Sequence, residues 1–334
     1  MIPRSTPFPK SPSWRQQLGG AFTSVEALLK WLHLDPARLP YSCNDTPDFP
    51  FRVTREFAAR MHKGDAFDPL LLQVLPLQQE SLAAAGFVCD PVGDAQAAVT
   101  PGVLHKYHGR ALLITTAACA IHCRYCFRRH FPYRQHLQQP ISAETLEMLA
   151  SHQVSEVILS GGDPLALSDQ RLKLLFAQLW QLPDLERLRV HTRMPVVLPS
   201  RVTPELLGLL RQSPLPVATV LHVNHPNELD DSVAAALRLL RQGGAHLLNQ
   251  AVLLKGINDS AETLAALCER GYEAGILPYY VHLLDKVAGS AHFAVSRRRA
   301  VELETELRNR LPGYLVPRFV TEIPAEKAKL PLVK

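Results

Sequence analysis

Three cysteines within eight residues are the part of this sequence best suited to chemistry. Cys119, Cys123 and Cys126 stand in the run C-A-I-H-C-R-Y-C-F, with C-x3-C-x2-C spacing, and the chain of 334 residues holds only six cysteines. Three thiolates on one short loop are one ligand too few for a closed four-ligand metal site. The spacing therefore predicts a 4Fe–4S cluster that keeps one iron open to another ligand.

Zinc is the rival interpretation of this loop, because His122 or His130 could supply a fourth ligand. Structural zinc usually takes a second Cys/His pair about a dozen or more residues away. No such pair stands out in this sequence. The other cysteines, Cys43, Cys89 and Cys268, lie far from the loop, and we expect them to be buried as small apolar residues.

The elements that must position the loop begin near residue 101, where apolar runs of strand length alternate with helix-period segments. This alternation predicts a parallel sheet with right-handed crossovers, either an open doubly wound sheet or a partial barrel. The expected strands are Ala111–Thr116, Glu156–Ser160, Leu188–Thr192, Ala218–Val223, His246–Val252 and Tyr279–Leu283. The expected helices are Asp169–Leu182, Pro204–Gln212, Asp230–Gln242, Ala261–Glu273 and Val295–Arg310.

Unusual tracts follow the ends of three of these strands. The cysteine loop follows the first, Ser160-Gly161-Gly162-Asp163-Pro164 the second, and residues 222–228 (H-V-N-H-P-N-E) the fourth. In a barrel of alternating strands and helices, the loops after the carboxyl ends of the strands carry the chemistry. No G-x-G-x-x-G follows the first strand, which disfavours a dinucleotide site. We therefore expect one site on one face of a partial barrel.

Residues 1–100 are predicted to form a mainly helical region, and residues 101–334 the core, with a boundary near Pro101-Gly102. Apolar spacing predicts a helix over Phe22–Leu34, capped by Thr23 or Ser24, and a second over Phe51–Met61.

The overall charge is mildly basic, with 36 Lys and Arg against 31 Asp and Glu. We expect no direct binding of nucleic acid, because the one dense basic run, Arg297-Arg298-Arg299, reads as a solvated helix face. No apolar run reaches the roughly 18 residues of a membrane span. The few cysteines show no disulfide framework, which predicts the cytoplasm.

The first strand, its C-x3-C-x2-C loop and the Gly161-Gly162 pair resemble the radical S-adenosylmethionine superfamily. From about residue 45 nearly to the end, the chain is similar to the lysine 2,3-aminomutase family within it. The motifs that carry this similarity are Cys126–Phe131, Ser160–Asp163, Pro195–Pro199, Asn224–Glu228, Asn249–Leu254 and Gly256–Asp259. The resemblance implies a partial (β/α)6 TIM-like barrel that uses a 4Fe–4S cluster, S-adenosylmethionine and pyridoxal phosphate.

The resemblance assigns the cofactor residues. It makes Cys119, Cys123 and Cys126 the cluster ligands, and Ser160, Gly161, Gly162 and Asp163 the tract beside the methionine amino group. Lys106, Tyr107 and Arg110 match the positions that contact the phosphate of pyridoxal phosphate. Lys329 matches the lysine that forms a Schiff base with that cofactor. The glycine run that precedes this lysine in the family is missing here, so Lys327 competes for the role.

The substrate implied by the resemblance is L-lysine. Arg128 matches the residue that binds its carboxylate, and Asp259 and Glu322 match the two acids that bind its ε-ammonium. Glu322 is one methylene longer than the family's usual aspartate. For Asp259 a second interpretation stays open, a capping residue of the turn Asn258-Asp259-Ser260.

The reaction implied is that of an isomerase, an intramolecular aminotransferase that converts L-lysine to β-lysine. The sequence ends five residues after Lys329 and lacks the family's C-terminal zinc-binding extension. Together with Glu322 and the missing glycines, this looks like the EpmB-type branch. That branch makes (R)-β-lysine, which a partner ligase attaches to elongation factor P.

A flavodoxin or ferredoxin is the expected electron donor. The alternatives are a stand-alone aminomutase for catabolism or osmolyte synthesis, and a non-catalytic Fe–S or zinc protein that binds RNA.

Overall fold

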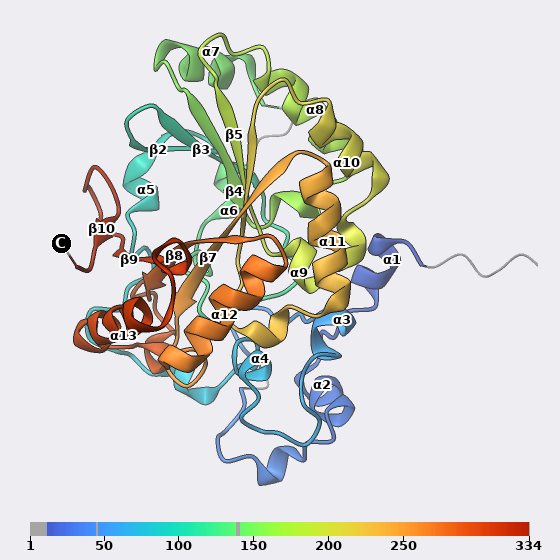
Figure 1. The fold of residues 1–334 in the computed structure, drawn as a ribbon, viewed down its shortest axis with the longest axis vertical. Helices are drawn as coiled ribbons and strands as arrows, with labels where there is room; N and C mark the ends of the chain where they lie inside the picture. The colour runs from blue at the N-terminus through green and yellow to red at the C-terminus, as the bar shows by residue number, and fades with distance from the viewer. Residues whose placement is uncertain (1–11, 45, 138–140, 334) are drawn as a thin grey trace, which may run out of the picture.

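A single curved sheet organises the chain, which the computed structural model describes over residues 12–44, 46–137 and 141–333 (Figure 1). In these residues ten strands pair in chain order: β1 (Ala98–Thr100), β2 (Val103–Tyr107), β3 (Arg110–Thr116), β4 (Glu156–Gly161), β5 (Arg187–Thr192), β6 (Val217–Leu221), β7 (Ala245–Leu253), β8 (Leu277–Leu283), β9 (Arg318–Thr321) and β10 (Leu330–Pro331). Strands β3 to β9 run parallel, from Arg110↔Glu156 at one side to Tyr280↔Arg318 at the other. Strands β1, β2 and β10 add antiparallel edges.

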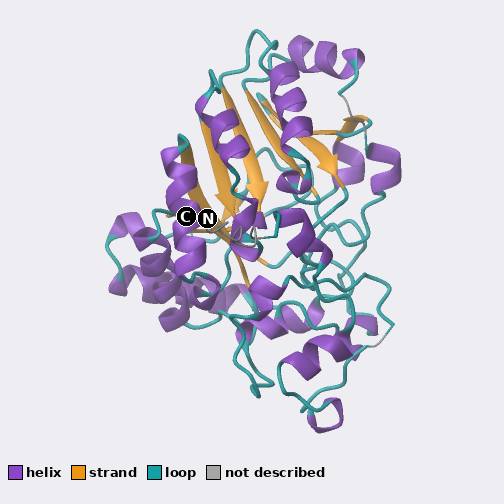
Figure 2. Cartoon of the chain, turned by 90° about the vertical axis from the view of Figure 1, so that its right-hand side faces the viewer, coloured by secondary structure: helices purple, strands orange, loops and turns teal. Residues whose placement is uncertain are grey.

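Helices cover the outer face of this sheet (Figures 1 and 2). The α-helices are α1 (Trp14–Gly19), α2 (Val25–Trp31), α3 (Arg55–Ala58), α4 (Pro69–Leu72), α5 (Asp94–Ala97), α6 (Tyr133–His136), α7 (Ala143–Ser151), α8 (Asp169–Leu179), α9 (Met194–Val197), α10 (Pro204–Arg211), α11 (Asp231–Gln242), α12 (Ala261–Glu273) and α13 (Arg297–Arg310). Short 3-10 turns are η1 (Pro36–Arg38), η2 (Gln78–Ser81), η3 (Pro164–Ala166), η4 (Pro199–Arg201), η5 (Pro226–Glu228), η6 (Ala291–Phe293) and η7 (Gly313–Leu315).

Helix α11 shows why these segments fold as they do. The Asp230 side chain accepts the backbone N–H of Val233 and so caps the first turn. Four apolar residues three and four positions apart form its buried face: Val233, Ala236, Leu237 and Leu240. Strand β4, by contrast, is buried at nearly every position, as expected for a parallel strand covered on both sides.

All six expected strands are present, and each expected core helix lies within two or three residues of its expected bounds. The sheet is larger than expected, because β9 is a seventh parallel strand and β1, β2 and β10 were not anticipated. The expected helix over 51–61 is wrong except for α3, since Val53 pairs with Phe22 in an antiparallel bridge. The first helix is shorter than expected and is capped by Ser24.

The N-terminal helices share one hydrophobic cluster with the barrel, in which Leu28 and Phe57 are buried together with Val157 and Leu237. The boundary expected near Pro101-Gly102 falls in the turn between β1 and β2. The division into residues 1–100 and 101–334 therefore stays a prediction about segments of the chain, and residues 1–11 lie outside the described part.

The two edges of the sheet approach each other across the open side of the barrel (Figure 1). Lys106 of β2 forms an ion pair with Glu322, which follows β9, at 3.0 Å. A Cβ on Gly93 would lie 3.2 Å from Cβ of Pro324. Within the described residues β1 and β10 do not pair. These side chains, together with a backbone bridge between Val88 and Val287, thus draw the partial barrel together.

The cysteines outside the loop differ in their exposure to solvent. Cys268 is buried as expected, Cys43 is half-buried, and the expectation is wrong for Cys89, which is exposed in an N-terminal loop. Arg298 and Arg299 form ion pairs with Glu302 on the same helix, as a solvated face would. In the part of the chain that the structure describes, no helix is both long and apolar enough to cross a membrane.

Candidate active site

A cavity of about 430 Å³ lies at the carboxyl ends of the parallel strands. It brings together nearly all of the residues that the sequence singles out: Lys106, Tyr107, Arg110, Cys119, Cys123, Cys126, Arg128, Ser160, Gly161, Gly162, Asp163, Glu322 and Lys329. Asp259 and Lys327 are not among the residues that line it. Residues from 106 to 329 therefore meet in one space large enough for small-molecule cofactors and a substrate.

The cysteine loop enters the cavity directly after β3. Burial raises the pKa of the Cys126 thiol to about 11, and neighbouring Cys123 adds to the shift. A positively charged group fits such a set of half-buried thiols, because coordination deprotonates a thiol outright. Among the described residues, no three His, Cys, Asp or Glu side chains are arranged closely enough to hold a single metal ion. The case for a cluster accordingly comes from the spacing of the loop.

The N-terminal region braces this loop from behind. Glu80 forms ion pairs with Arg124 at 2.5 Å and with Arg129 at 2.6 Å, and all three side chains are buried. The ring of Phe49 lies under both guanidinium groups, 5.1 Å from each. The backbone N–H of Arg124 also donates to the carbonyl of Gln73. Residues 49–80 thus fix the shape of the segment that carries the cysteines.

The glycine pair is required by close backbone approach. Gly161 has φ +111°, a conformation that other residues rarely adopt. A Cβ on Gly162 would lie 2.5 Å from the carbonyl oxygen of Ala118 in the cysteine loop. The N–H of Gly162 donates to Thr116 O, and that of Asp163 donates to Ala118 O. The end of β4 and the cysteine loop are therefore locked together.

The carboxylate of Asp163 is occupied by protein groups. It accepts hydrogen bonds from the Thr192 hydroxyl and from the backbone N–H groups of Leu165, Arg193 and Met194. This arrangement joins the loops after β4 and β5. A direct role for Asp163 in binding a cofactor stays a prediction.

Four buried polar atoms of residues in the cavity wall have no hydrogen-bond partner among the described residues. They are His191 Nε2, Arg193 Nε, His222 Nε2 and Gln250 Oε1, on or just after β5, β6 and β7. Leaving such atoms unsatisfied is costly, so the site is built for a polar ligand. None of these residues was predicted as a site residue, although His222 opens the unusual tract at the end of the fourth expected strand.

A chain of charged groups crosses the floor of the cavity. Arg128 Nε contacts Asp94 at 2.7 Å, and Lys106 Nζ contacts the other oxygen of Asp94 at 2.6 Å. Lys106 also reaches Glu322 at 3.0 Å. Burial would raise the pKa of Asp94, but Arg128 and Lys106 more than offset this and hold it below its usual value. Asp94 was not predicted as a site residue, and nothing in its local sequence marks it.

Lys329 lies at the far end of this chain. Its Nζ is 3.3 Å from Glu322 Oε2 and 3.1 Å from His282 Nε2. Burial lowers the pKa of Lys329, while Glu322 and Asp285 partly offset the shift. Lys327, the competing lysine, is exposed. The geometry therefore favours Lys329 as the amine that faces the cavity.

Asp285 takes the place beside Glu322 that was expected for Asp259. It lines the cavity, and burial, together with the charge of Glu322, raises its pKa to about 7. The Asp259 carboxylate instead accepts the N–H of Gly256 at 2.9 Å, which is the turn-capping role left open above. Asp285 follows the expected strand over 279–283 by two residues, so its position at a carboxyl end could have identified it.

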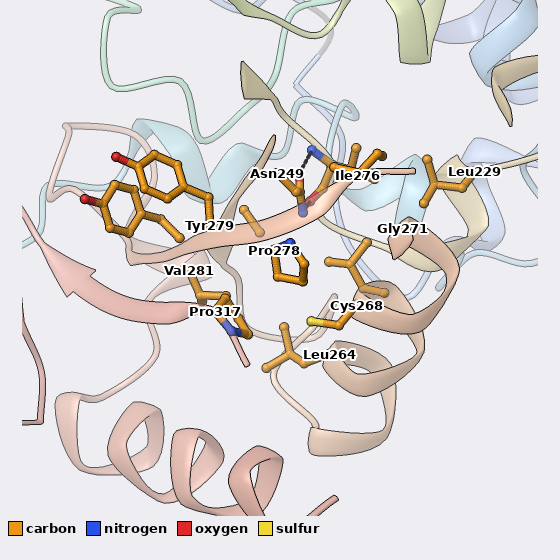
Figure 3. Close-up of a pocket in the computed structure, with 14 residues that line it drawn as sticks. Leu229, Asn249, Leu264, Cys268, Gly271, Ile276, Pro278, Tyr279, Val281 and Pro317 are labelled. Carbon is orange, nitrogen blue, oxygen red and sulfur yellow. Dashed lines mark hydrogen bonds between the residues drawn. The ribbon is translucent and has the colours of Figure 1, made fainter. Parts of the chain in front are cut away.

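A second hollow lies behind β8, where Cys268 and Leu264 of α12 face Pro278 and Val281 (Figure 3). Its volume is about 10 Å³, which is the room of about one water molecule. The hollow is a packing gap between β8 and α12, and it shares only Tyr279 and Tyr280 with the lining of the large cavity.

Comparison with known proteins gives consistent matches along the chain. The family model of the radical SAM superfamily matches residues 113–268. L-lysine 2,3-aminomutase of Escherichia coli is 45% identical over 327 residues, covering 97% of this chain and 95% of the relative. The protein of that name from Haemophilus influenzae is 41% identical over 331 residues, with 98% of both chains covered. The one from Clostridium subterminale is 32% identical over 323 residues, with 96% of this chain and 77% of the relative covered.

Proposed function

The chain belongs to the lysine 2,3-aminomutase family of radical S-adenosylmethionine enzymes, and from that premise we propose that it converts L-lysine to β-lysine. The α-amino nitrogen moves from carbon 2 to carbon 3, and a hydrogen moves in the opposite direction. Substrate and product are isomers, so the reaction needs no net oxidant. The sequence identities to the aminomutases favour an isomerase. They disfavour the non-catalytic Fe–S or zinc protein, which the cysteine loop alone did not exclude.

The observation that carries the proposal is that one cavity holds the cysteine triplet, the glycine pair, Lys329 and the carboxylates of Glu322 and Asp285. When bound, the cluster with S-adenosylmethionine supplies an adenosyl radical, and pyridoxal phosphate supplies the π-system through which nitrogen can move between adjacent carbons. The unsatisfied polar atoms of His191, Arg193, His222 and Gln250 fit a requirement for polar cofactors.

The residues then have distinct tasks under this proposal. The three cysteines hold the cluster, the backbone at Ser160, Gly161 and Gly162 receives the methionine end of S-adenosylmethionine, and Lys329 anchors pyridoxal phosphate. Lys106, Tyr107 and Arg110 receive its phosphate. Arg128 is paired with Asp94 and Ser160, so its guanidinium is already held in place for a carboxylate.

The ε-ammonium of the substrate is received by Glu322 and Asp285. Two carboxylates are suited to a cation, and burial makes the attraction stronger than it would be in water. Glu322 already contacts two lysine amines, Lys106 and Lys329, so an ammonium group suits its surroundings. The walls of the cavity orient the substrate and exclude water from reactive species.

A more specific proposal concerns the use of the β-lysine product. We propose the EpmB-type role, in which (R)-β-lysine is passed to a ligase that modifies elongation factor P in the cytoplasm. The higher identity to the E. coli and H. influenzae relatives than to the clostridial one supports this branch. The test is the mass of elongation factor P after deletion of the gene. Loss of a β-lysyl increment is expected, whereas an unchanged mass would leave a stand-alone aminomutase.

The reaction itself is tested by omission. Purified protein is reconstituted with the cluster, S-adenosylmethionine, pyridoxal phosphate and a reductant such as flavodoxin or ferredoxin, and then incubated with L-lysine. We expect β-lysine only when every component is present. Product formed without pyridoxal phosphate would contradict the role given to Lys329.

A further inference from the structure

Lys329 Nζ has two polar neighbours of different kinds. One is the carboxylate of Glu322 at 3.3 Å, and the other is the imidazole Nε2 of His282 at 3.1 Å. The ring of Tyr280 lies beneath the amine, 5.6 Å away. His282 is part of β8 and is buried at 4% exposure, so its ring is held by the sheet rather than by a loop.

The direction of this hydrogen bond follows from chemistry. In its protonated form the Lys329 amine can only donate, so His282 then accepts at Nε2 and carries its own proton at Nδ1. Burial, followed by the positive charge of Lys329, keeps the pKa of His282 well below its ordinary value. The other titratable or charged groups near Lys329 or His282 are Glu322, Asp285, Tyr280, Arg189, His191, His222 and Lys106. With this surrounding charge the imidazole stays neutral at neutral pH.

A neutral hydrogen-bond acceptor can hold the Lys329 amine without favouring its protonated form, which Glu322 cannot do. A carboxylate next to an amine favours its protonated form, and a protonated lysine is no nucleophile. Glu322 is also shared with Lys106 and, under the proposed function, with the substrate ammonium. While Glu322 is engaged with substrate, Lys329 needs another acceptor that leaves its amine reactive.

We propose that His282 is the positioning residue of Lys329, a neutral hydrogen-bond acceptor that keeps this amine aimed at pyridoxal phosphate. The proposal rests on the proposed function, because it assumes that Lys329 carries the cofactor. It adds a residue whose role neither the sequence motifs nor the relatives' names assign.

Two amide substitutions separate positioning from packing. In His282→Gln the amide reaches the Nε2 position, whereas in His282→Asn it reaches only the Nδ1 position. Both are polar and similar in size, and thermal unfolding checks that both variants fold. The rate of pyridoxal phosphate capture is followed by the absorbance of the protein-bound cofactor, and borohydride trapping with mass spectrometry locates the lysine. His105→Leu, outside the cavity, controls for loss of a histidine.

We expect His282→Gln to capture pyridoxal phosphate within about threefold of the wild-type rate, and His282→Asn to be slower by about tenfold, the size of one lost hydrogen bond. Equal rates in the two variants, whether normal or reduced, would overturn the proposal. If wild-type protein is not trapped at Lys329, the proposed function fails along with it. If wild-type protein is trapped there and the two variants agree, only the role of His282 fails.

Discussion

Lys327 and Lys329 stand two residues apart and differ in what a cofactor-binding lysine needs. Lys329 is buried beside Glu322 and His282, and burial lowers its pKa toward a reactive amine, whereas Lys327 is exposed. The sequence could count residues from Glu322 to Lys329 but could not show which amine faces the cavity. The same limit explains Asp259, whose motif matched although its carboxylate caps a turn.

The lysine pair gives a matched test. Lys329→Ala is expected to lose trapped pyridoxal phosphate and to lower β-lysine formation by more than about 1000-fold, since the Lys106 amine in the same cavity is already paired with Asp94 and Glu322. Lys327→Ala is expected to retain both. Peptide mapping after borohydride reduction checks the site, and a trapped adduct on Lys327 would reverse the assignment.

The raised pKa of Asp285 predicts that the activity toward L-lysine depends on pH. Its pKa is raised to about 7 by burial and by Glu322, so below that pH the carboxyl is protonated and attracts the ε-ammonium less. We expect kcat/KM for L-lysine to rise with pH through an inflection near 7, because this ratio reports groups of the free enzyme. Asp285→Asn should lower the plateau and remove that inflection. A variant profile that keeps the inflection would assign it to another group.

At the scale of elements, the seven parallel strands bring distant residues together, and most of this arrangement was predictable. Buried parallel strands read as continuous apolar runs, and six of the seven were expected on that basis. Strand β9 was not predicted because Arg318–Thr321 is only four residues long. The N-terminal helix over 51–61 failed because tertiary pairing of Val53 with Phe22 overrides local helical spacing.

The junction between β4 and the cysteine loop is tested by a glycine substitution. Gly162→Ala would place Cβ 2.5 Å from Ala118 O, an overlap that backbone cannot absorb cheaply. We expect S-adenosylmethionine affinity of the cluster-loaded protein to fall by about tenfold or more, measured by calorimetry. Gly208→Ala is the control, because open space surrounds it in α10. That change should stabilise the fold by about 0.5–1 kcal/mol and leave binding intact.

The brace behind the cysteine loop is tested at Glu80. Glu80→Gln leaves Arg124 and Arg129 buried without their carboxylate, a change that costs about 3–5 kcal/mol in comparable buried pairs. We expect the reconstituted cluster to be lost faster to a chelator, followed by its visible absorbance. Glu262→Gln, which breaks an exposed ion pair with Arg310, should not change that rate. Equal rates in the two variants would show that the brace does not hold the loop.

At the scale of the whole molecule, one cavity collects groups from across the chain, from Lys106 of β2 to Lys329. The sequence motifs predicted which strand ends contribute, because carboxyl ends of parallel strands meet at one edge. They could not predict the partners that the curvature brings in. Asp94 joins Arg128 to Lys106, and Lys106 joins the two edges of the sheet through Glu322.

The central claim is that this cavity moves an amino group within one lysine molecule. The most direct test incubates the reconstituted protein with L-lysine carrying nitrogen-15 at carbon 2 and carbon-13 at carbon 3. We predict β-lysine in which NMR shows nitrogen-15 bonded to carbon-13. Unchanged lysine despite a reduced cluster and trapped Lys329, or β-lysine that has lost the nitrogen label, would contradict the account.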